Sequence, residues 1–265
     1  MDSEFIDKIY LAHNACKNCP TPQQVAGFFD DLLGVLFPNF SSNAVQSKEA
    51  LEWRFTELST ELESLIGGQK KTTSLLVKQF FSKLPRVYEQ LNKDVDAIYA
   101  GDPAATESDE VIRAYPGFYA IAAYRIAHEL LTAGVDIIPR SITELAHSRT
   151  GIDIHPGARI GERFFIDHGP GVVIGAPTII GDDVKIYQGV TLGALSVDKT
   201  QVNMKRHLTI GDRVVIYSGA TVLGGTTEIG SDSIIGGNTW LTKSVPTHSR
   251  VYYKPTVEQE VKQNN

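Results

Sequence analysis

An aliphatic residue recurs every six positions through the second half of the chain. The period shifts by two residues after Ile166 and by one after Val222, and it is interrupted between Leu192 and Ile210. A six-residue period suits a triangular coil, in which a short strand forms each flat side and the recurring aliphatic side chain points inward. Strands of a β-sandwich would instead alternate with a period of two. The sequence therefore predicts a parallel β-helix whose stacked coils bury Ile154, Ile160, Ile166, Ile174, Ile180, Ile186, Leu192, Ile210, Ile216, Val222, Ile229, Ile235 and Leu241.

Glycine follows many of these aliphatic residues, as at Gly161, Gly181 and Gly211. Small or β-branched residues often lie two positions before them, as at Ala158 and Val184. Small residues and glycine are therefore expected at the corners of each coil, where bulk or a negative φ would be unfavourable.

The first 150 residues have the pattern of helices. Apolar residues recur at spacings of three and four over residues 51–68, 73–102 and 117–134, with a break expected near Pro85. A further short helix is expected over residues 136–150. The chain is thus predicted to be an α+β protein with a helical domain over residues 1–150, a β-helix over residues 151–250 and a polar tail over residues 251–265.

The net charge of −6 argues against a nucleic-acid partner, because no basic surplus is present to neutralise phosphates. No apolar stretch approaches the roughly 20 residues that span a bilayer, and the N-terminal residues lack the apolar core of a signal peptide. A cytoplasmic protein that does not bind membranes is expected. Cys16 and Cys19 form a CxxC pair near His13, but no second Cys/His pair completes a zinc site, so no metal is expected.

Polar residues that could act in catalysis gather at two irregular points of the repeat. The interruption after Leu192 is too long for one repeat and is expected to project as a loop ending in Arg206 and His207. The two-residue shift follows Asp167 and His168, which are expected at a turn. Two histidines and several carboxylates at these points favour a catalytic site over tolerated irregularities.

Several motifs of the chain resemble those of the serine acetyltransferase family. They are DIHPGARIG, IDHGPGVVIG, VTLGALS and KRH in the repeats, and GDPAA and YPGFYAIAAYRIAHEL in the helical half. The resemblance covers roughly residues 90 to 250. It implies a left-handed parallel β-helix that transfers the acetyl group of acetyl-CoA to the hydroxyl of L-serine, the first step of cysteine biosynthesis.

The resemblance also implies roles for individual residues. His168 is expected to be the general base with Asp153 as its carboxylate partner, a pairing that their spacing alone does not require. The pocket for the amino-acid substrate is expected to contain Asp102, Asp167, Arg206 and His207. Contacts with the acyl-CoA are expected from Gly193, Ala194, Ala220, Gly237 and Lys243.

The chemistry of acyl transfer is consistent with these roles. A serine hydroxyl is barely ionised at neutral pH, and a base that removes its proton accelerates such reactions on the order of 10²–10⁴-fold. A carboxylate such as Asp102 or Asp167 would receive the substrate ammonium, and Arg206 could bind the substrate carboxylate. His207 could donate a hydrogen bond to the developing oxyanion. No cysteine lies near these positions in the sequence, which favours direct attack on the thioester.

Members of the family form trimers with active sites between neighbouring prisms, and their helical domains commonly join two trimers into a hexamer. The resemblance therefore implies a homo-oligomer in which one subunit supplies His168 and the next supplies Arg206 and His207. Inhibition by L-cysteine is expected because cysteine resembles serine. The polar sequence up to Asn265 lacks the C-terminal isoleucine with which many bacterial members bind the O-acetylserine sulfhydrylase, which argues against that complex.

Three other functions fit parts of the sequence. A different hexapeptide acyltransferase, acting on a sugar amine or another hydroxyl compound, would share the solenoid but would not need Asp102. A metalloenzyme resembling the γ-class carbonic anhydrases would need three imidazoles at a subunit interface, where His168 and His207 could be joined only by His155 or His248. A non-catalytic scaffold would need none of these polar groups.

Overall fold

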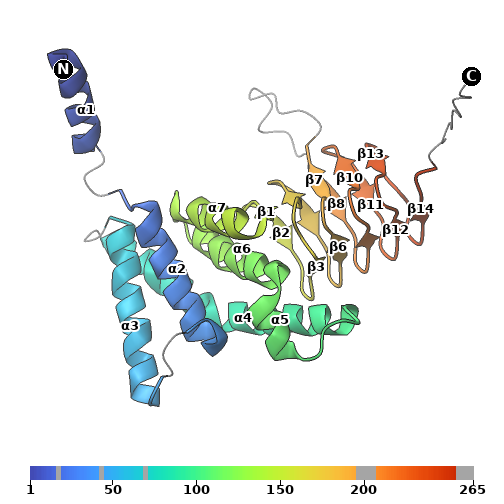
Figure 1. Cartoon of the computed structure of the whole chain (residues 1–265), viewed down its shortest axis with the longest axis horizontal. Coiled ribbons are helices and arrows are strands. Elements are labelled where there is room, and N and C mark those ends of the chain that lie inside the picture. The colour runs from blue at the N-terminus through green and yellow to red at the C-terminus, as the bar shows by residue number, and fades with distance from the viewer. Residues whose placement is uncertain (16–18, 42–44, 68–70, 195–206, 255–265) are drawn as a thin grey trace, which may run out of the picture.

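The computed structural model describes residues 1–265 except 16–18, 42–44, 68–70, 195–206 and 255–265. A helical part leads into a prism of short strands (Figure 1). The helices are α1 (Ser3–Ala15), α2 (Pro22–Leu36), α3 (Lys48–Leu65), α4 (Lys71–Gly101), α5 (Ser108–Ala114), α6 (Pro116–Thr132) and α7 (Ile138–Thr150), with the 3₁₀ turn η1 (Pro38–Phe40). Within the described ranges, no helix combines the length and the hydropathy that a membrane span requires.

The strands form three parallel sheets, one on each side of the prism. The first sheet contains β1 (Asp153–Ile154), β4 (Val173–Ile174), β7 (Thr191–Gly193), β10 (Thr221–Leu223) and β13 (Trp240–Leu241). The second contains β2 (Arg159–Ile160), β5 (Ile179–Ile180), β8 (Thr209–Ile210) and β11 (Glu228–Ile229). The third contains β3 (Phe165–Asp167), β6 (Lys185–Tyr187), β9 (Val215–Ile216), β12 (Ile234–Ile235) and β14 (Arg250–Val251).

The register between coils confirms the predicted parallel β-helix. Each inward aliphatic pairs with the inward aliphatic of the next coil, as Ile154 does with Ile174 in the first sheet. In the second sheet Ile160 pairs with Ile180, and the same rule holds throughout the third sheet. These side chains are buried, apart from a partly exposed Leu241 at the far end. The six-residue period therefore produces three stacked columns of apolar side chains.

The two-residue shift of the repeat corresponds to an enlarged corner between β3 and β4. Gly171 lies beside Gly189 of the next coil, and Gly189 lies beside Gly219, so these three occupy equivalent corner positions. His168 and Gly169 are the additional residues, and both have positive φ, at 59° and 103°. The register resumes at β4, so the addition changes this corner without displacing the columns.

The glycines that follow the inward aliphatics meet one of the two expectations for the corners of the coils, the avoidance of bulk. Gly161 and Gly211 are not among the residues with positive φ. A Cβ on Gly161 would lie 2.3 Å from the Asp182 carboxylate, and one on Gly211 would lie 2.6 Å from the backbone nitrogen of Ser231. For Gly161 and Gly211 the expectation that a bulkier residue would be unfavourable is therefore confirmed, because glycine allows neighbouring coils to approach closely. The expectation of a positive φ at these two residues is wrong.

The break expected near Pro85 is also wrong, because α4 continues through it. Proline removes one backbone hydrogen bond from a helix interior. Leu84 and Val87, on either side of Pro85, are buried in the core, so tertiary packing outweighs the local penalty.

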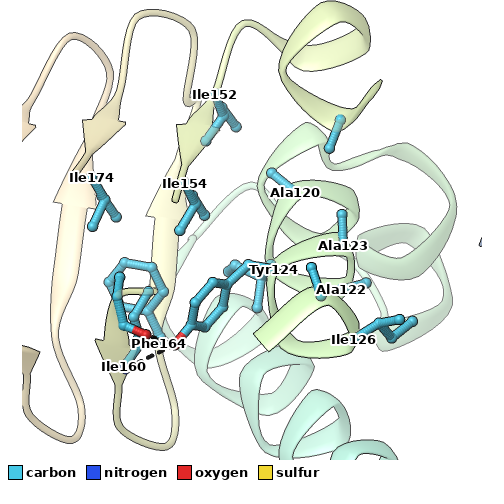
Figure 2. Packing of buried hydrophobic residues seen from close by; sticks show 14 of the residues in the cluster. Ala120, Ala122, Ala123, Tyr124, Ile126, Ile152, Ile154, Ile160, Phe164 and Ile174 are labelled. Carbon is cyan, nitrogen blue, oxygen red and sulfur yellow. Dashed lines mark hydrogen bonds between the residues drawn. The ribbon is translucent and has the colours of Figure 1, made fainter. Parts of the chain in front are cut away.

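The helical part closes the open end of the β-helix. The first coil has no preceding coil to bond, so side chains from α4 and α6 satisfy its outer backbone groups. Tyr124 donates its hydroxyl to the Ala158 carbonyl at 2.9 Å and accepts from the amide of Ile160 at 3.0 Å, and Figure 2 shows its ring directed at this coil. The described core accordingly runs from α2 to the last coils as one hydrophobic cluster.

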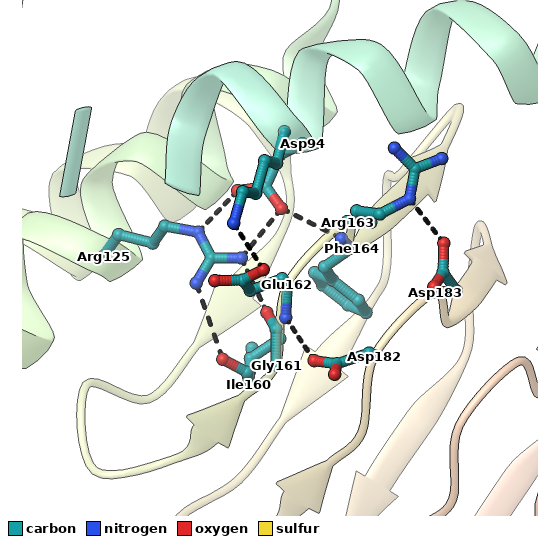
Figure 3. Close-up of polar contacts among 10 residues, drawn as sticks. Asp94, Arg125, Ile160, Gly161, Glu162, Arg163, Phe164, Asp182 and Asp183 are labelled. Carbon is teal, nitrogen blue, oxygen red and sulfur yellow. Dashed lines mark hydrogen bonds and ion pairs between the residues drawn. The ribbon is translucent and has the colours of Figure 1, made fainter. Parts of the chain in front are cut away.

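A buried ion pair completes this closure (Figure 3). The Arg125 guanidinium bonds both oxygens of Asp94, at 2.5 and 2.8 Å, and donates to the Gly161 carbonyl at 2.8 Å. Asp94 also accepts from the backbone amide of Phe164 at 2.9 Å. Asp94 and Arg125 therefore join α4, α6 and the first coil in one network that is almost fully shielded from solvent.

We predict that Arg125→Met strongly destabilises the fold. The substitution leaves the Asp94 carboxylate buried without its partner, which typically costs about 3–5 kcal/mol. The free energy of unfolding in urea would measure the loss. The matched control is Arg113→Met, which breaks an exposed pair with Asp109 on α5 and should change stability by well under about 1 kcal/mol. Equal effects of the two substitutions would contradict the conclusion that the buried pair of Asp94 and Arg125 stabilises the junction of α4, α6 and the first coil.

Candidate active site

Asp102 lies directly after α4, where the helical part meets the third sheet. It accepts hydrogen bonds from the Tyr115 hydroxyl at 2.7 Å and from the backbone amide of Ala104 at 2.9 Å. The Ala104 amide and then the Tyr115 hydroxyl hold the pKa of Asp102 below its usual value. The hydrogen bond with Asp102 raises the pKa of Tyr115 to about 12. Asp102 therefore stays ionised, and Tyr115 stays protonated, around neutral pH.

Asp167 and His168 lie at the end of β3 and on the enlarged corner that follows it. The Asp167 side chain is only 12% exposed, whereas the His168 side chain is 71% exposed. The Nε2 atom of His168 is 3.8 Å from the Oδ1 atom of Asp167. His168 is also close enough to Asp102 to contribute to lowering its pKa. The structure thus brings together three of the predicted residues, Asp102, Asp167 and His168.

Lys185 of β6 is a member of this cluster that sequence reasoning missed. Its ammonium lies 3.2 Å from the Oδ2 atom of Asp167 and donates to the Gly101 carbonyl at 2.8 Å. Burial acts to lower the pKa of Lys185, but contacts with the side chains of Tyr187 and Asp167 outweigh it and the pKa is raised. The sequence feature that could have indicated Lys185 is its position next to the inward Ile186, which directs its side chain to the outside of the strand. Tyr115 was likewise not singled out, although it lies in one of the quoted motifs.

Asp153 lies on β1 and faces α7. Its carboxylate accepts from Arg140 at 3.0 Å, and no Asp153 oxygen of this chain lies within the 4.0 Å ion-pair distance of His168, both residues being described. Glu144, His147 and Asp153 are close enough together to share a cation, but Arg140 contacts both carboxylates of this group. The pairing of Asp153 with His168 stays a prediction.

His207 lies on a different edge of the prism from His168. It precedes β8, between the first and second sheets, with its Nδ1 atom 3.1 Å from the Pro177 carbonyl. His168 lies between the third and first sheets. Arg206 is outside the described residues. Within one chain, His207 and His168 therefore lie on different edges of the prism and do not share a site.

The residues expected to contact acyl-CoA divide between the same two edges. Gly193 ends β7, Ala194 follows it, and the exposed Lys243 follows β13, all on the edge of His207. Ala220 and Gly237 lie on the edge of His168, before β10 and β13. The Ala220 side chain is buried, so this residue can offer a ligand only its backbone.

In chemical terms, the cluster combines two carboxylates, a resident ammonium and an exposed imidazole. Asp102 and Asp167 supply negative charge for a cationic group of a ligand. The accessible ring of His168 can take a proton from a hydroxyl held beside it. The arrangement therefore suits a base-assisted reaction of a small ammonium-bearing alcohol.

Comparisons with known proteins agree with this description. No protein-family model matches the chain. The chain is 52% identical over 181 residues to a serine acetyltransferase, plasmid, of Synechococcus elongatus, a match that covers 66% of this chain and 56% of that protein. It is 48% identical over 162 residues to the serine acetyltransferase of Mycobacterium tuberculosis, a match that covers 61% of this chain and 69% of that protein.

Solved structures share the fold. The serine acetyltransferase isoform 3 of Entamoeba histolytica, in complex with cysteine, superposes with a TM-score of 0.80 at 37% identity, over 89% of this chain and 84% of that one. Two more distant structures, each with a TM-score of 0.63 at 26% identity over 93% of this chain, are serine acetyltransferases. One, from Neisseria gonorrhoeae, is in complex with serine and is covered to 87%, and the other, from Brucella abortus, is in complex with coenzyme A and is covered to 85%.

The identity to the M. tuberculosis protein, together with the shared architecture, decides the relationship. A helical part followed by a parallel β-helix is thus the architecture that this chain shares with solved serine acetyltransferases. The chain belongs to the serine acetyltransferase family.

Proposed function

We propose that the protein transfers the acetyl group of acetyl-CoA to the hydroxyl of L-serine, giving O-acetyl-L-serine and CoA. The observation that carries this proposal is the meeting of Asp102, Asp167 and His168 where the helical part joins the β-helix. The names of the relatives, and the serine and coenzyme A bound in two related structures, support the same reaction. Its product would enter cysteine biosynthesis.

His168 is proposed as the general base. Its imidazole accepts the proton of the serine hydroxyl as the oxygen attacks the thioester carbonyl, and the C–S bond then breaks to release CoA as the thiol. Asp167, 3.8 Å from the ring, favours the imidazolium that forms. Asp153 is proposed to support the same base, through a rearrangement of its contact with Arg140.

Asp102 and Asp167 are proposed to bind the substrate ammonium. Because the pKa of Asp102 is lowered, its carboxylate remains charged at every pH at which a histidine base is neutral. Arg206 is proposed to bind the substrate carboxylate as a two-pronged donor, and His207 to stabilise the oxyanion. The placement of His207 on another edge of the prism supports a site shared between copies, in a trimer or a pair of trimers.

L-cysteine is proposed as an inhibitor that competes for the amino-acid pocket. It differs from serine only in a thiol for a hydroxyl, so the carboxylates that bind one ammonium would bind the other. Related structures in complex with cysteine support this proposal. A cytoplasmic location is proposed because acetyl-CoA is an intracellular metabolite.

The first test follows release of CoA thiol from purified protein with acetyl-CoA and L-serine. His168→Asn should lower kcat at least about 100-fold, because asparagine tolerates positive φ but cannot act as the base. The matched control is His248→Asn, since His248 is also exposed, has a φ of 57° and lies beside a carboxylate. The control should retain full activity. Acetylation of a sugar but not of serine by the unmodified protein would overturn the proposed substrate.

A second test removes the charge of Asp102. Asp102→Asn should raise KM for L-serine about 10–100-fold, because a charge-assisted hydrogen bond contributes about 1.5–3 kcal/mol, while KM for acetyl-CoA should change little. Asp96→Asn, at an exposed position of α4, should leave both constants unchanged. A parallel rise of both constants after Asp102→Asn would contradict a role in amino-acid binding.

A third test concerns Tyr115. Tyr115→Phe removes a hydrogen bond that lowers the pKa of Asp102, so this pKa should rise, and serine binding should weaken first at the acidic end of the pH range. NMR titration of protein labelled with ¹³C at aspartate carboxyl groups would measure the pKa. Tyr217 follows β9 and stacks on Tyr187, and the control Tyr217→Phe should leave the pKa of Asp102 unchanged. A pKa that falls after Tyr115→Phe would refute this electrostatic account.

A further inference from the structure

We propose that Lys185 is the positioning residue of the amino-acid pocket, acting through Asp167 and through the turn that carries Asp102. The inference rests on the proposed function, because it assigns the substrate ammonium to these two carboxylates. It adds a residue whose role is to fix their orientation and to limit the charge that the pocket accepts.

The contacts of Lys185 connect the two halves of the pocket. Asp167 belongs to β3 of the first coil, and Asp102 belongs to the segment that follows α4. The Lys185 ammonium bonds the carbonyl of Gly101, the residue before Asp102, and pairs with the Oδ2 atom of Asp167. One cation from the second coil therefore sets the position of both carboxylates relative to each other.

Neighbouring side chains hold the ammonium in place. It lies 4.3 Å from the ring centroid of Phe165 and 4.8 Å from that of Tyr187, both distances typical of cation–π contacts. Tyr187 in turn stacks on Tyr217 at 5.0 Å, and Phe165 is buried beneath Gly101. The Lys185 side chain is 19% exposed, so it has little freedom to swing into solvent.

The two oxygens of Asp167 have different partners as a result. Oδ2 pairs with Lys185, and Oδ1 is the oxygen nearest to His168. Without the lysine, the Asp167 carboxylate could rotate and the Gly101 carbonyl, next to Asp102, would lose its hydrogen bond from the β-helix. With it, two carboxylates and one resident ammonium leave a single unbalanced negative charge. The pocket is therefore matched to a ligand with one ammonium group, such as an α-amino acid, and disfavours dications.

The test is a steady-state comparison of Lys185→Met, Lys185→Arg and the control Lys93→Met. Lys93 also joins α4 to the first coil, through an exposed pair with Glu162 at 2.7 Å, but it lies outside the pocket. We expect Lys185→Met to raise KM for L-serine at least about tenfold and to leave KM for acetyl-CoA within about twofold. Lys185→Arg should restore most of the affinity for serine, and Lys93→Met should resemble the unmodified protein. Should Lys185→Met not fold, Lys185→Gln provides the same loss of charge with a donor retained.

Three outcomes would overturn the inference. An unchanged KM for serine in Lys185→Met would show that the carboxylates keep their positions without the lysine. A lower KM would show that Lys185 acts only as a competing charge. Equal changes of both KM values in Lys185→Met and Lys93→Met would show a general effect of loosening the junction. Failure of the unmodified protein and of Lys93→Met to acetylate serine would instead refute the proposed function.

Discussion

The open end of the first coil is the constraint on which the rest of the structure depends. The inner coils bond their backbone to a coil on each side, whereas the first coil, at the end that the helices cover, has a neighbouring coil on one side only. Tyr124, Arg125 and Asp94 supply the missing partners from two helices. Because an unpaired polar group of the backbone is unfavourable when buried, the solenoid needs this helical cap for stability.

The same closure places the candidate site. α4 carries Asp94 in the buried ion pair and ends roughly two turns later, just before Asp102. Because α4 is held in place at Asp94, the helix positions Asp102 at the outer face of the third sheet. Asp167 and Lys185 lie on the same face. The helix that helps to close the first coil thus also positions a residue of the candidate site. This explains why the helical part and the β-helix share a continuous core.

Much of the fold could be predicted because the six-residue period expresses a purely local geometric rule. The position of a residue within the six-residue period shows whether its side chain points inward. Ile154 and Ile174 could therefore be identified as inward residues without knowledge of the tertiary structure. Pro85 was misjudged because a helix that is buried on both sides of a proline tolerates it. The expected intolerance of bulk at Gly161 is confirmed, but the sequence does not show that its cause is Asp182 of the next coil and not a positive φ.

The candidate site was accessible to sequence reasoning only in part. The resemblance to a family gave Asp102 and His168, and the structure places them near each other. The position of Lys185 could not be read in this way, since its partners come from three segments that meet only after folding. Asp153 was named from the sequence, but its partner in the structure was not. That partner, Arg140, belongs to α7, and the repeat does not show how this helix packs against the β-helix.

The enlarged corner at His168 and Gly169 has a wider consequence for how such proteins can change. The corner between β3 and β4 contains two additional residues, and the stacked columns of apolar side chains keep their alignment. The corners of a β-helix can thus vary in length almost independently of its interior. New chemistry could be introduced at other corners by short insertions, and the candidates for redesign are the corners that lie near the helical part.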